Sequence, residues 1–167
     1  PRTGFPGEVS GRLRPAKSWK PIEQATMSYG HGLSVNLVQL ARAYTVFASD
    51  GELKPATLLK GNGPVAGKPV LKPETARAVR RMLEMAVQPG GTAPKAQIPG
   101  YRVAGKTGTA EVPPRQDLSW FAAMTESQGE RHVIVVLVEQ GGHGSTTAAP
   151  IARHIIDFLA QIEDFQK

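Results

Sequence analysis

Four consecutive residues, Lys106, Thr107, Gly108 and Thr109, have the types and spacing of a surface that receives a carboxylate. In an extended segment alternate side chains share a face, so the two threonine hydroxyls project together while Lys106 points the opposite way. Two hydroxyls on one face can donate to both oxygens of a carboxylate. Gly108 lets a ligand or another backbone approach closely, and a free strand N–H can help stabilise an oxyanion. The stretch therefore predicts one wall of an active site.

The residue that would perform the chemistry is missing from the sequence. Lys-Thr-Gly is similar to a signature of the penicillin-binding proteins and serine β-lactamases, and this resemblance implies a nucleophile in a separate Ser-x-x-Lys motif. The residue three positions after Ser10 is Leu13, the one after Ser34 is Leu37, and no other serine is followed by lysine at that spacing. We therefore expect the nucleophile to lie outside this chain.

Length and composition indicate a soluble globular chain. The 167 residues suffice for one domain with a sizeable core. Mean hydropathy is −0.24, and no apolar run approaches the roughly 18 residues that span a bilayer. The net charge of +6 is dispersed, which favours a solvated surface over a nucleic-acid partner. The chain has no cysteine for disulfides or thiolate metal sites, and its four histidines lack ligand spacing.

Three segments have the apolar periodicity of helices. They span residues 34–49, 73–86 and 148–165. Ser34 is the expected N-cap of the first helix, and Asp50 with Gly51 is its stop signal. Residues 1–22, rich in proline, glycine and basic side chains, are predicted to be loop, and residues 51–72 a short hairpin.

Three strands are expected in the second half of the chain, at residues 101–110, 118–125 and 131–139. The last one is apolar on both faces between residues 133 and 138, which is typical of a strand covered on both sides. In a sheet of three sequential antiparallel strands it would nevertheless lie at an edge, where apolar strands promote aggregation. A further strand must come from residues 1–72 or from another polypeptide, and we favour the second.

Four segments carry a family resemblance: residues 3–8, 25–35, 39–44 and 105–110. The last contains Gly-Lys-Thr-Gly-Thr-Ala, and Lys-Thr-Gly is a signature of penicillin-binding proteins and serine β-lactamases. In order and spacing the four segments resemble the C-terminal half of the transpeptidase domain of class B penicillin-binding proteins, in particular the division-type enzymes. Residues 1–167 are thus expected to be the C-terminal portion of a single transpeptidase domain.

The resemblance implies an α/β fold of the α+β kind, with three antiparallel strands, flanking helices and a sheet completed by strands from an N-terminal portion. One of those strands would lie beside residues 133–138. It also implies a serine-type D,D-transpeptidase that cross-links peptidoglycan stem peptides in septal cell-wall synthesis and is acylated by β-lactams. Neither a metal nor another cofactor is implied, and this chain alone is expected to be inactive.

The resemblance assigns roles to individual residues. Lys106 would contact the serine of the family's Ser-x-Asn motif, while Thr107 and Thr109 would hold the carboxylate of the substrate or β-lactam. The backbone N–H of Thr109 would form half of the oxyanion hole, beside Gly108. Tyr29 and His31 would line the pocket. The chain also contains Ser-x-Asn at residues 34–36, but relatives carry a similar sequence at the start of a helix, so this copy is interpreted as a helix cap.

The resemblance also implies partners and a location. A separate polypeptide, the N-terminal portion of the same transpeptidase, would carry Ser-x-x-Lys and the family's Ser-x-Asn. A membrane glycosyltransferase and cell-division proteins would assemble with the enzyme at the periplasmic face of the bacterial inner membrane, with the anchor outside this chain.

Three alternatives stay open. The chain could belong to a non-catalytic penicillin-binding sensor or scaffold, to a serine β-lactamase, or to an elongation-type transpeptidase. Glu111 and the pattern at residues 139–144 are closer to elongation-type or actinobacterial members. His143, in a glycine-rich turn, is expected to be solvated.

Overall fold

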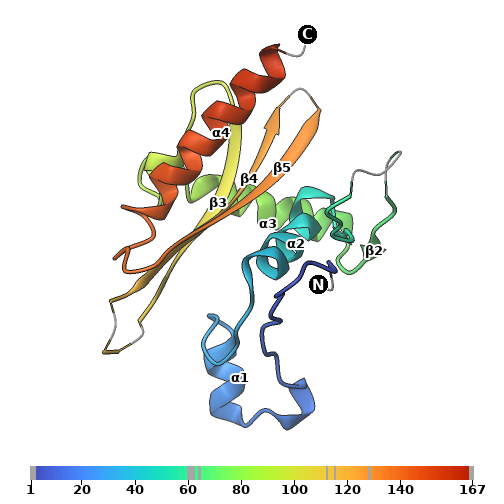
Figure 1. The fold of residues 1–167 in the computed structure, drawn as a ribbon, viewed down its shortest axis with the longest axis vertical. Coiled ribbons are helices and arrows are strands. Elements are labelled where there is room, and N and C mark those ends of the chain that lie inside the picture. The colour runs from blue at the N-terminus through green and yellow to red at the C-terminus, as the bar shows by residue number, and fades with distance from the viewer. Residues whose placement is uncertain are drawn as a thin grey trace.

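The computed structural model describes residues 3–59, 63, 65–111, 113–114, 116–127 and 129–165. Its centre is an antiparallel sheet with the strand order β3-β4-β5 (Figure 1). The strands are β3 (Arg102–Ala110), β4 (Leu118–Ser127) and β5 (Glu130–Val138). The three expected strands are confirmed with small shifts at their ends, and so is the α+β fold class.

Pairing in this sheet fixes which side chains share a face. Thr107 lies opposite Phe121 across the β3–β4 pair, and Phe121 lies opposite Val136 across the β4–β5 pair. Directly opposed residues point to the same side of an antiparallel sheet. Thr107, Phe121 and Val136 are therefore on one face, and Lys106 with its partner Ala122 is on the other.

The C-terminal helix α4 (Ala148–Phe165) covers the face that carries Phe121. Its bounds are those expected from the apolar periodicity. Phe121 is fully buried there, against the helix residues Ala152 and Ile156 and a short 3-10 helix, η2 (Pro94–Ala96). This layer is the larger of the two cores.

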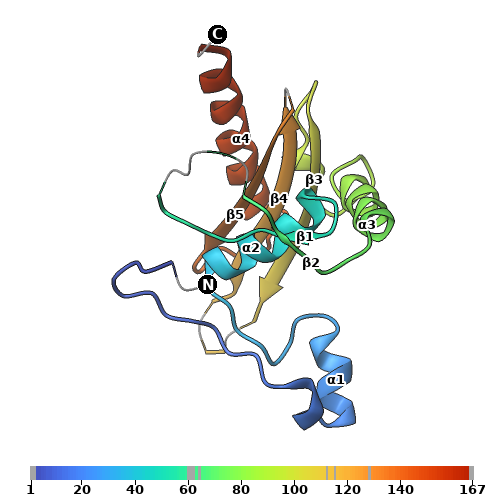
Figure 2. The ribbon, with the colours of Figure 1, turned by 90° about the vertical axis from the view of Figure 1, so that its right-hand side faces the viewer.

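Helices α2 (Leu37–Ala48) and α3 (Pro73–Met85) cover the opposite face (Figure 2). The expectation that Ser34 caps the first of these helices was wrong. Asn36 is the cap, because its side-chain oxygen accepts the Gln39 N–H at 2.7 Å. The Ser34 hydroxyl instead accepts the backbone N–H of Arg12 at 2.9 Å.

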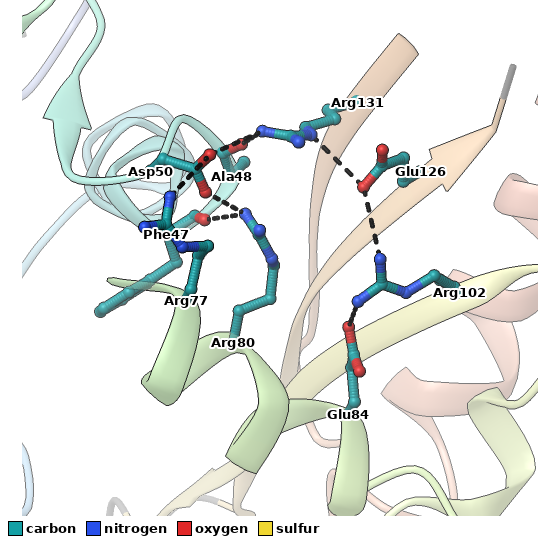
Figure 3. A network of polar contacts seen from close by, with 9 residues as sticks. All are labelled: Phe47, Ala48, Asp50, Arg77, Arg80, Glu84, Arg102, Glu126 and Arg131. Atoms are coloured by element: carbon teal, nitrogen blue, oxygen red, sulfur yellow. Dashed lines mark hydrogen bonds and ion pairs between the residues drawn. The ribbon is translucent and has the colours of Figure 1, made fainter. Parts of the chain in front are cut away.

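An ion-pair network joins the end of α2 to α3 and the sheet (Figure 3). Asp50 pairs with Arg80 at 2.9 Å and lies 3.8 Å from Arg131. Both arginines also donate at 2.7 Å to carbonyls of the last turn of α2, Arg80 to Phe47 and Arg131 to Ala48. The cations therefore neutralise the negative end of the helix dipole and attach it to its neighbours.

The same network reaches the first residue of β3. Arg102 pairs with Glu84 of α3 at 2.6 Å, and Glu126 of β4 lies between Arg102 and Arg131, at 4.0 and 3.4 Å. These contacts bring together one helix and all three strands. They anchor the N-terminal end of β3.

The N-terminal region is more regular than the sequence suggested. It forms a 3-10 turn, η1 (Ala16–Ser18), and a short helix, α1 (Pro21–Met27), away from the sheet. Glu23 accepts the backbone N–H of Lys20 at 2.8 Å and pairs with Arg14 at 2.7 Å, and these two contacts, in that order, hold the pKa of Glu23 below its usual range. The expected hairpin is confirmed as the antiparallel pair β1 (Glu52–Leu53) and β2 (Lys68–Pro69).

The apolar character of β5 is explained by the two helices on its faces. Helix α2 contacts β5 on one face and α4 contacts it on the other, so each face of the strand is at least partly covered. Within the described residues its only strand neighbour is β4, and β1 pairs with β2 instead. The described part of residues 1–72 therefore adds no strand to this sheet, and the outer edge of β5 is open.

Replacing Phe121 by alanine should strongly destabilise the complete transpeptidase domain. A fully buried aromatic ring would leave a cavity, which costs about 3–5 kcal/mol of the free energy of unfolding. Urea unfolding of Phe121→Ala measures this loss. Leu59→Ala, at a side chain 82% exposed, is the control and should stay within about 0.5 kcal/mol of the parent. Equal effects of the two substitutions would contradict the proposed core.

Candidate substrate-carboxylate site on β3

The Lys-Thr-Gly stretch lies in the second half of β3, at the edge of the described sheet. β3 pairs only with β4 there, so the N–H and C=O groups along its other edge have no strand partner in the described part of the chain. Lys106 and Thr109 are exposed, and Thr107 and Gly108 are half-buried. An extended ligand could therefore pair with this edge while its end groups reach the side chains.

The structure places the two hydroxyls and the amine on opposite faces, as the alternation predicted. Thr107 and Thr109 share the α4 side of the sheet. Lys106 is on the α2 and α3 side, where its Nζ donates to the carbonyl of Thr107 at 2.7 Å. Among the described residues this carbonyl is the amine's hydrogen-bond partner, and an exposed amine can leave such a bond for a ligand at little cost, since water replaces it.

Gly108 is required by an aromatic neighbour. A Cβ at Gly108 would lie 1.8 Å from Cε2 and 2.0 Å from Nε1 of Trp120, so the indole lies directly against the β3 backbone. Trp120 is the cross-strand partner of Gly108 and also borders the groove described below.

The loop at residues 141–147 approaches the same strand from the α4 side. The backbone N–H of Gly144 donates to Oγ1 of Thr109 at 3.3 Å. Within the loop, the Thr147 hydroxyl donates to the carbonyl of Gly141 at 2.6 Å, while His143 is exposed, as expected. Sequence reasoning did not identify Gly144, although three glycines among the four residues 141–144 were a signal that backbone approaches backbone here.

Tyr29 and His31 lie between α1 and α2, and both side chains are exposed. The structure does not bring either of them into contact with Lys106 or Thr109. An apolar groove of about 1030 Å³ lies between the two regions, lined by Gly30 on one side and Trp120 on the other, but not by Tyr29, His31, Lys106 or Thr109. The role of Tyr29 and His31 in a pocket stays a prediction.

This groove lies beside the Lys106 face of the sheet. The groove is lined mainly by apolar side chains of the segments 3–9 and 30–40, together with the ends of β3, β4 and β5. Several of its walls are large exposed side chains, among them Phe5, Val9 and Val35. Exposed apolar patches of this kind mark protein contact surfaces or ligand-binding grooves.

Chemically, the site offers a cation, two hydroxyls and backbone donors. Among the described residues no three His, Asp or Glu side chains gather in a way that could hold a metal ion. No helix in the described part of the chain has the length and apolar character needed to cross a membrane. The arrangement has the groups needed to bind an anion and to orient a peptide.

Comparison with known proteins identifies the family. The model of the penicillin-binding protein transpeptidase domain matches residues 1–157. The chain belongs to this family. The class B penicillin-binding protein resemblance of the sequence is thereby confirmed, and the fold agrees with it.

The chain is similar both to curated protein sequences and to solved structures. The peptidoglycan D,D-transpeptidase FtsI of Escherichia coli K12 is 37% identical over 158 residues, which cover 89% of this chain and 27% of FtsI. A crystal structure of a peptidoglycan glycosyltransferase from Burkholderia ambifaria is 49% identical with a TM-score of 0.88. The apo transpeptidase domain of Burkholderia pseudomallei penicillin-binding protein 3 is 47% identical with a TM-score of 0.87.

The chain spans only part of these relatives. The match to the Burkholderia ambifaria structure covers 98% of this chain and 52% of that chain. The match to the Burkholderia pseudomallei structure covers 97% of this chain and 53% of that chain. It therefore corresponds to about half of a solved transpeptidase chain and about a quarter of FtsI.

Gly108→Ala should lower the melting temperature of the complete transpeptidase domain by several degrees. The added methyl group would collide with the Trp120 indole, and such overpacking costs about 1–3 kcal/mol. Thermal unfolding measures the change. Trp120→Leu is the matched background, because a smaller side chain makes room for the methyl group. Gly108→Ala should cost less in that background, and an equal cost in both would show that the indole does not press on Gly108.

Proposed function

We propose that this chain is the C-terminal portion of a peptidoglycan D,D-transpeptidase domain, acting in septal cell-wall synthesis, whose active site is completed by a separate polypeptide segment. The observation that carries the proposal is the Lys106–Thr109 stretch on an open sheet edge, in a chain of the transpeptidase family that contains no Ser-x-x-Lys. The name of FtsI supports the reaction, and residues 1–167 would be one part of a single domain.

The reaction is acyl transfer through a serine of the missing segment. The serine oxygen attacks the carbonyl between the two D-alanines of a stem peptide, the peptide bond breaks, and the terminal D-alanine leaves with the serine proton. An amine of a neighbouring stem peptide then attacks the resulting ester. A new amide forms, the serine is regenerated, and two glycan strands are cross-linked.

The residues of β3 bind and orient the substrate in this reaction. The hydroxyls of Thr107 and Thr109 donate to the terminal carboxylate, which is why the enzyme acts at a chain end. The backbone N–H of Thr109 donates to the oxyanion of the tetrahedral intermediate, together with the N–H of the nucleophile. Lys106 adds positive potential and contacts the serine of the Ser-x-Asn motif. Tyr29 and His31 border the bound peptide from the α1–α2 connection.

The missing segment has a surface to dock on. The open edge of β5 accepts a strand, and the apolar groove beside Trp120 accepts a covering element on the Lys106 face. The greater length of the relatives supplies a source for both. The assembled enzyme works at the periplasmic face of the inner membrane, held by an anchor outside this chain, with a glycosyltransferase and division proteins as partners.

This chain alone should form no covalent adduct with a fluorescent penicillin, because it lacks the nucleophile. The complete transpeptidase domain should be labelled under the same conditions, which serves as the positive control. In-gel fluorescence after denaturation reads out both samples. Labelling of the isolated chain would mean that a nucleophile within residues 1–167 has been overlooked. Rapid release of the label by the complete domain would favour a β-lactamase instead.

Thr109→Ala should slow β-lactam acylation of the complete domain by roughly tenfold or more, because it removes a hydrogen bond to a charged carboxylate, worth about 1.5–3 kcal/mol. The second-order rate constant of acylation, from stopped-flow or competition labelling, measures the effect. Thr57→Ala, at an exposed threonine far from β3 in sequence, is the matched control and should leave the rate unchanged. An unchanged rate in Thr109→Ala would remove Thr109 from the carboxylate site.

A further inference from the structure

The Thr109 hydroxyl has a backbone hydrogen-bond partner in the loop at residues 141–147. The N–H of Gly144 donates to its Oγ1 at 3.3 Å, across 35 positions of the chain. A threonine hydroxyl has one proton to donate and two lone pairs that accept. Once a lone pair accepts the Gly144 N–H, the hydroxyl proton is free for an acceptor on another side. The contact therefore prepares Thr109 to act as a donor.

Only a glycine allows the loop to come this close. A Cβ at Gly144 would lie 2.6 Å from the carbonyl oxygens of both Gly108 and Trp120. Contacts that short do not occur, so any side chain would push the loop away from the β3–β4 pair. The backbone of the loop therefore packs directly against the backbone of the strand that carries Thr109.

Gly144 is also hydrogen-bonded to the start of helix α4. Its carbonyl accepts the N–H of Ala149 at 2.9 Å, in the first turn of α4. Ala148 and Ala149 are completely buried in the main core. The position of the Gly144 amide is therefore set by the packed start of α4 rather than by the loop alone.

We propose that Gly144 is a positioning residue for the carboxylate site: its N–H orients the Thr109 hydroxyl so that the hydroxyl donates to the substrate carboxylate. The proposal rests on the carboxylate role proposed above for Thr109. Gly144 itself touches no substrate. It acts by removing the orientations in which the hydroxyl would donate to the loop, so that less rotational freedom is lost when the carboxylate binds.

The test compares a penicillin with its methyl ester on the complete transpeptidase domain. The ratio of their acylation rate constants isolates the response to the carboxylate. Gly144→Ala and Thr109→Val should each lower this ratio by about fivefold or more, the equivalent of one net hydrogen bond. Thr146→Ala is the loop control, because it removes an internal loop bond to His143 and leaves the Gly144 amide in place. Its ratio should equal that of the parent.

The double variant, Gly144→Ala with Thr109→Val, shows whether the two substitutions lower the rate ratio through one mechanism or through two independent ones. If Gly144 acts through the hydroxyl, Gly144→Ala should add little to Thr109→Val, so the two effects are not additive. Full additivity overturns the proposal. A lowered ratio in Thr109→Val with a parental ratio in Gly144→Ala also overturns it, while leaving the proposed function intact. A parental ratio in Thr109→Val overturns the carboxylate role of Thr109 itself.

A second measurement does not depend on activity or on the folding of Gly144→Ala. The Gly144 amide should exchange with deuterium faster in Thr109→Val than in the parent, because its acceptor is gone. Thr109→Ser keeps the hydroxyl and should restore both the slow exchange and the carboxylate selectivity. Unchanged exchange in Thr109→Val would show that the hydrogen bond does not hold the amide, and the proposal would fail.

Discussion

Two aromatic side chains of β4 lie against glycines of β3, and the position of the candidate site depends on this contact. On the α4 side, a Cβ at Gly105 would lie 2.3 Å from the ring of Phe121. On the other side, Gly108 takes the Trp120 indole at similarly short range. An edge strand has neighbours on one side only, so close packing on both faces has to replace the second strand as the source of rigidity. The two glycines therefore allow the aromatic rings to pack against β3, in addition to leaving room for a ligand.

The same sheet is tightly packed at one end of β3 and open at the other. Arg102 begins the strand with contacts to Glu84 and Glu126, and the ion-pair network continues from there to the end of α2. Toward the other end, Lys106 bonds only to the next carbonyl among the described contacts, and Thr109 is exposed. The Thr109 hydroxyl accepts the Gly144 N–H but keeps its own proton for a ligand, and the Lys106 amine can exchange its single bond for one to a ligand. The contrast between the ion-paired start of β3 and its exposed end agrees with a general observation: binding residues are held by a rigid support but do not themselves stabilise it.

Regular patterns were predictable from the sequence, and single contacts were not. Periodicity placed α4 and the strands, because an amphipathic helix or an apolar strand repeats its signal over many residues. The cap of α2 depended on one hydrogen bond, and Ser34 and Asn36 are equally good cap types, so only the structure distinguishes them. The short helix α1 was missed because Glu23 and Arg14 hold it within a segment of loop-like composition. Gly144 could not be placed beside Thr109, since residues 35 positions apart meet only through the fold.

The open surfaces of the chain argue for completion by a segment with two different faces. β5 is apolar and contacts helices on both faces, yet its outer edge pairs with no strand of the described residues, so under the proposed function the segment that joins it would be a strand. The groove beside Trp120 is mainly apolar and lies between the segments 3–9 and 30–40, so what fills it must present apolar side chains. The groove lies on the same face of the sheet as Lys106, although Lys106 itself does not line it. Under the proposed function, burial of the apolar side chains of the groove would supply much of the energy that holds such a segment in place.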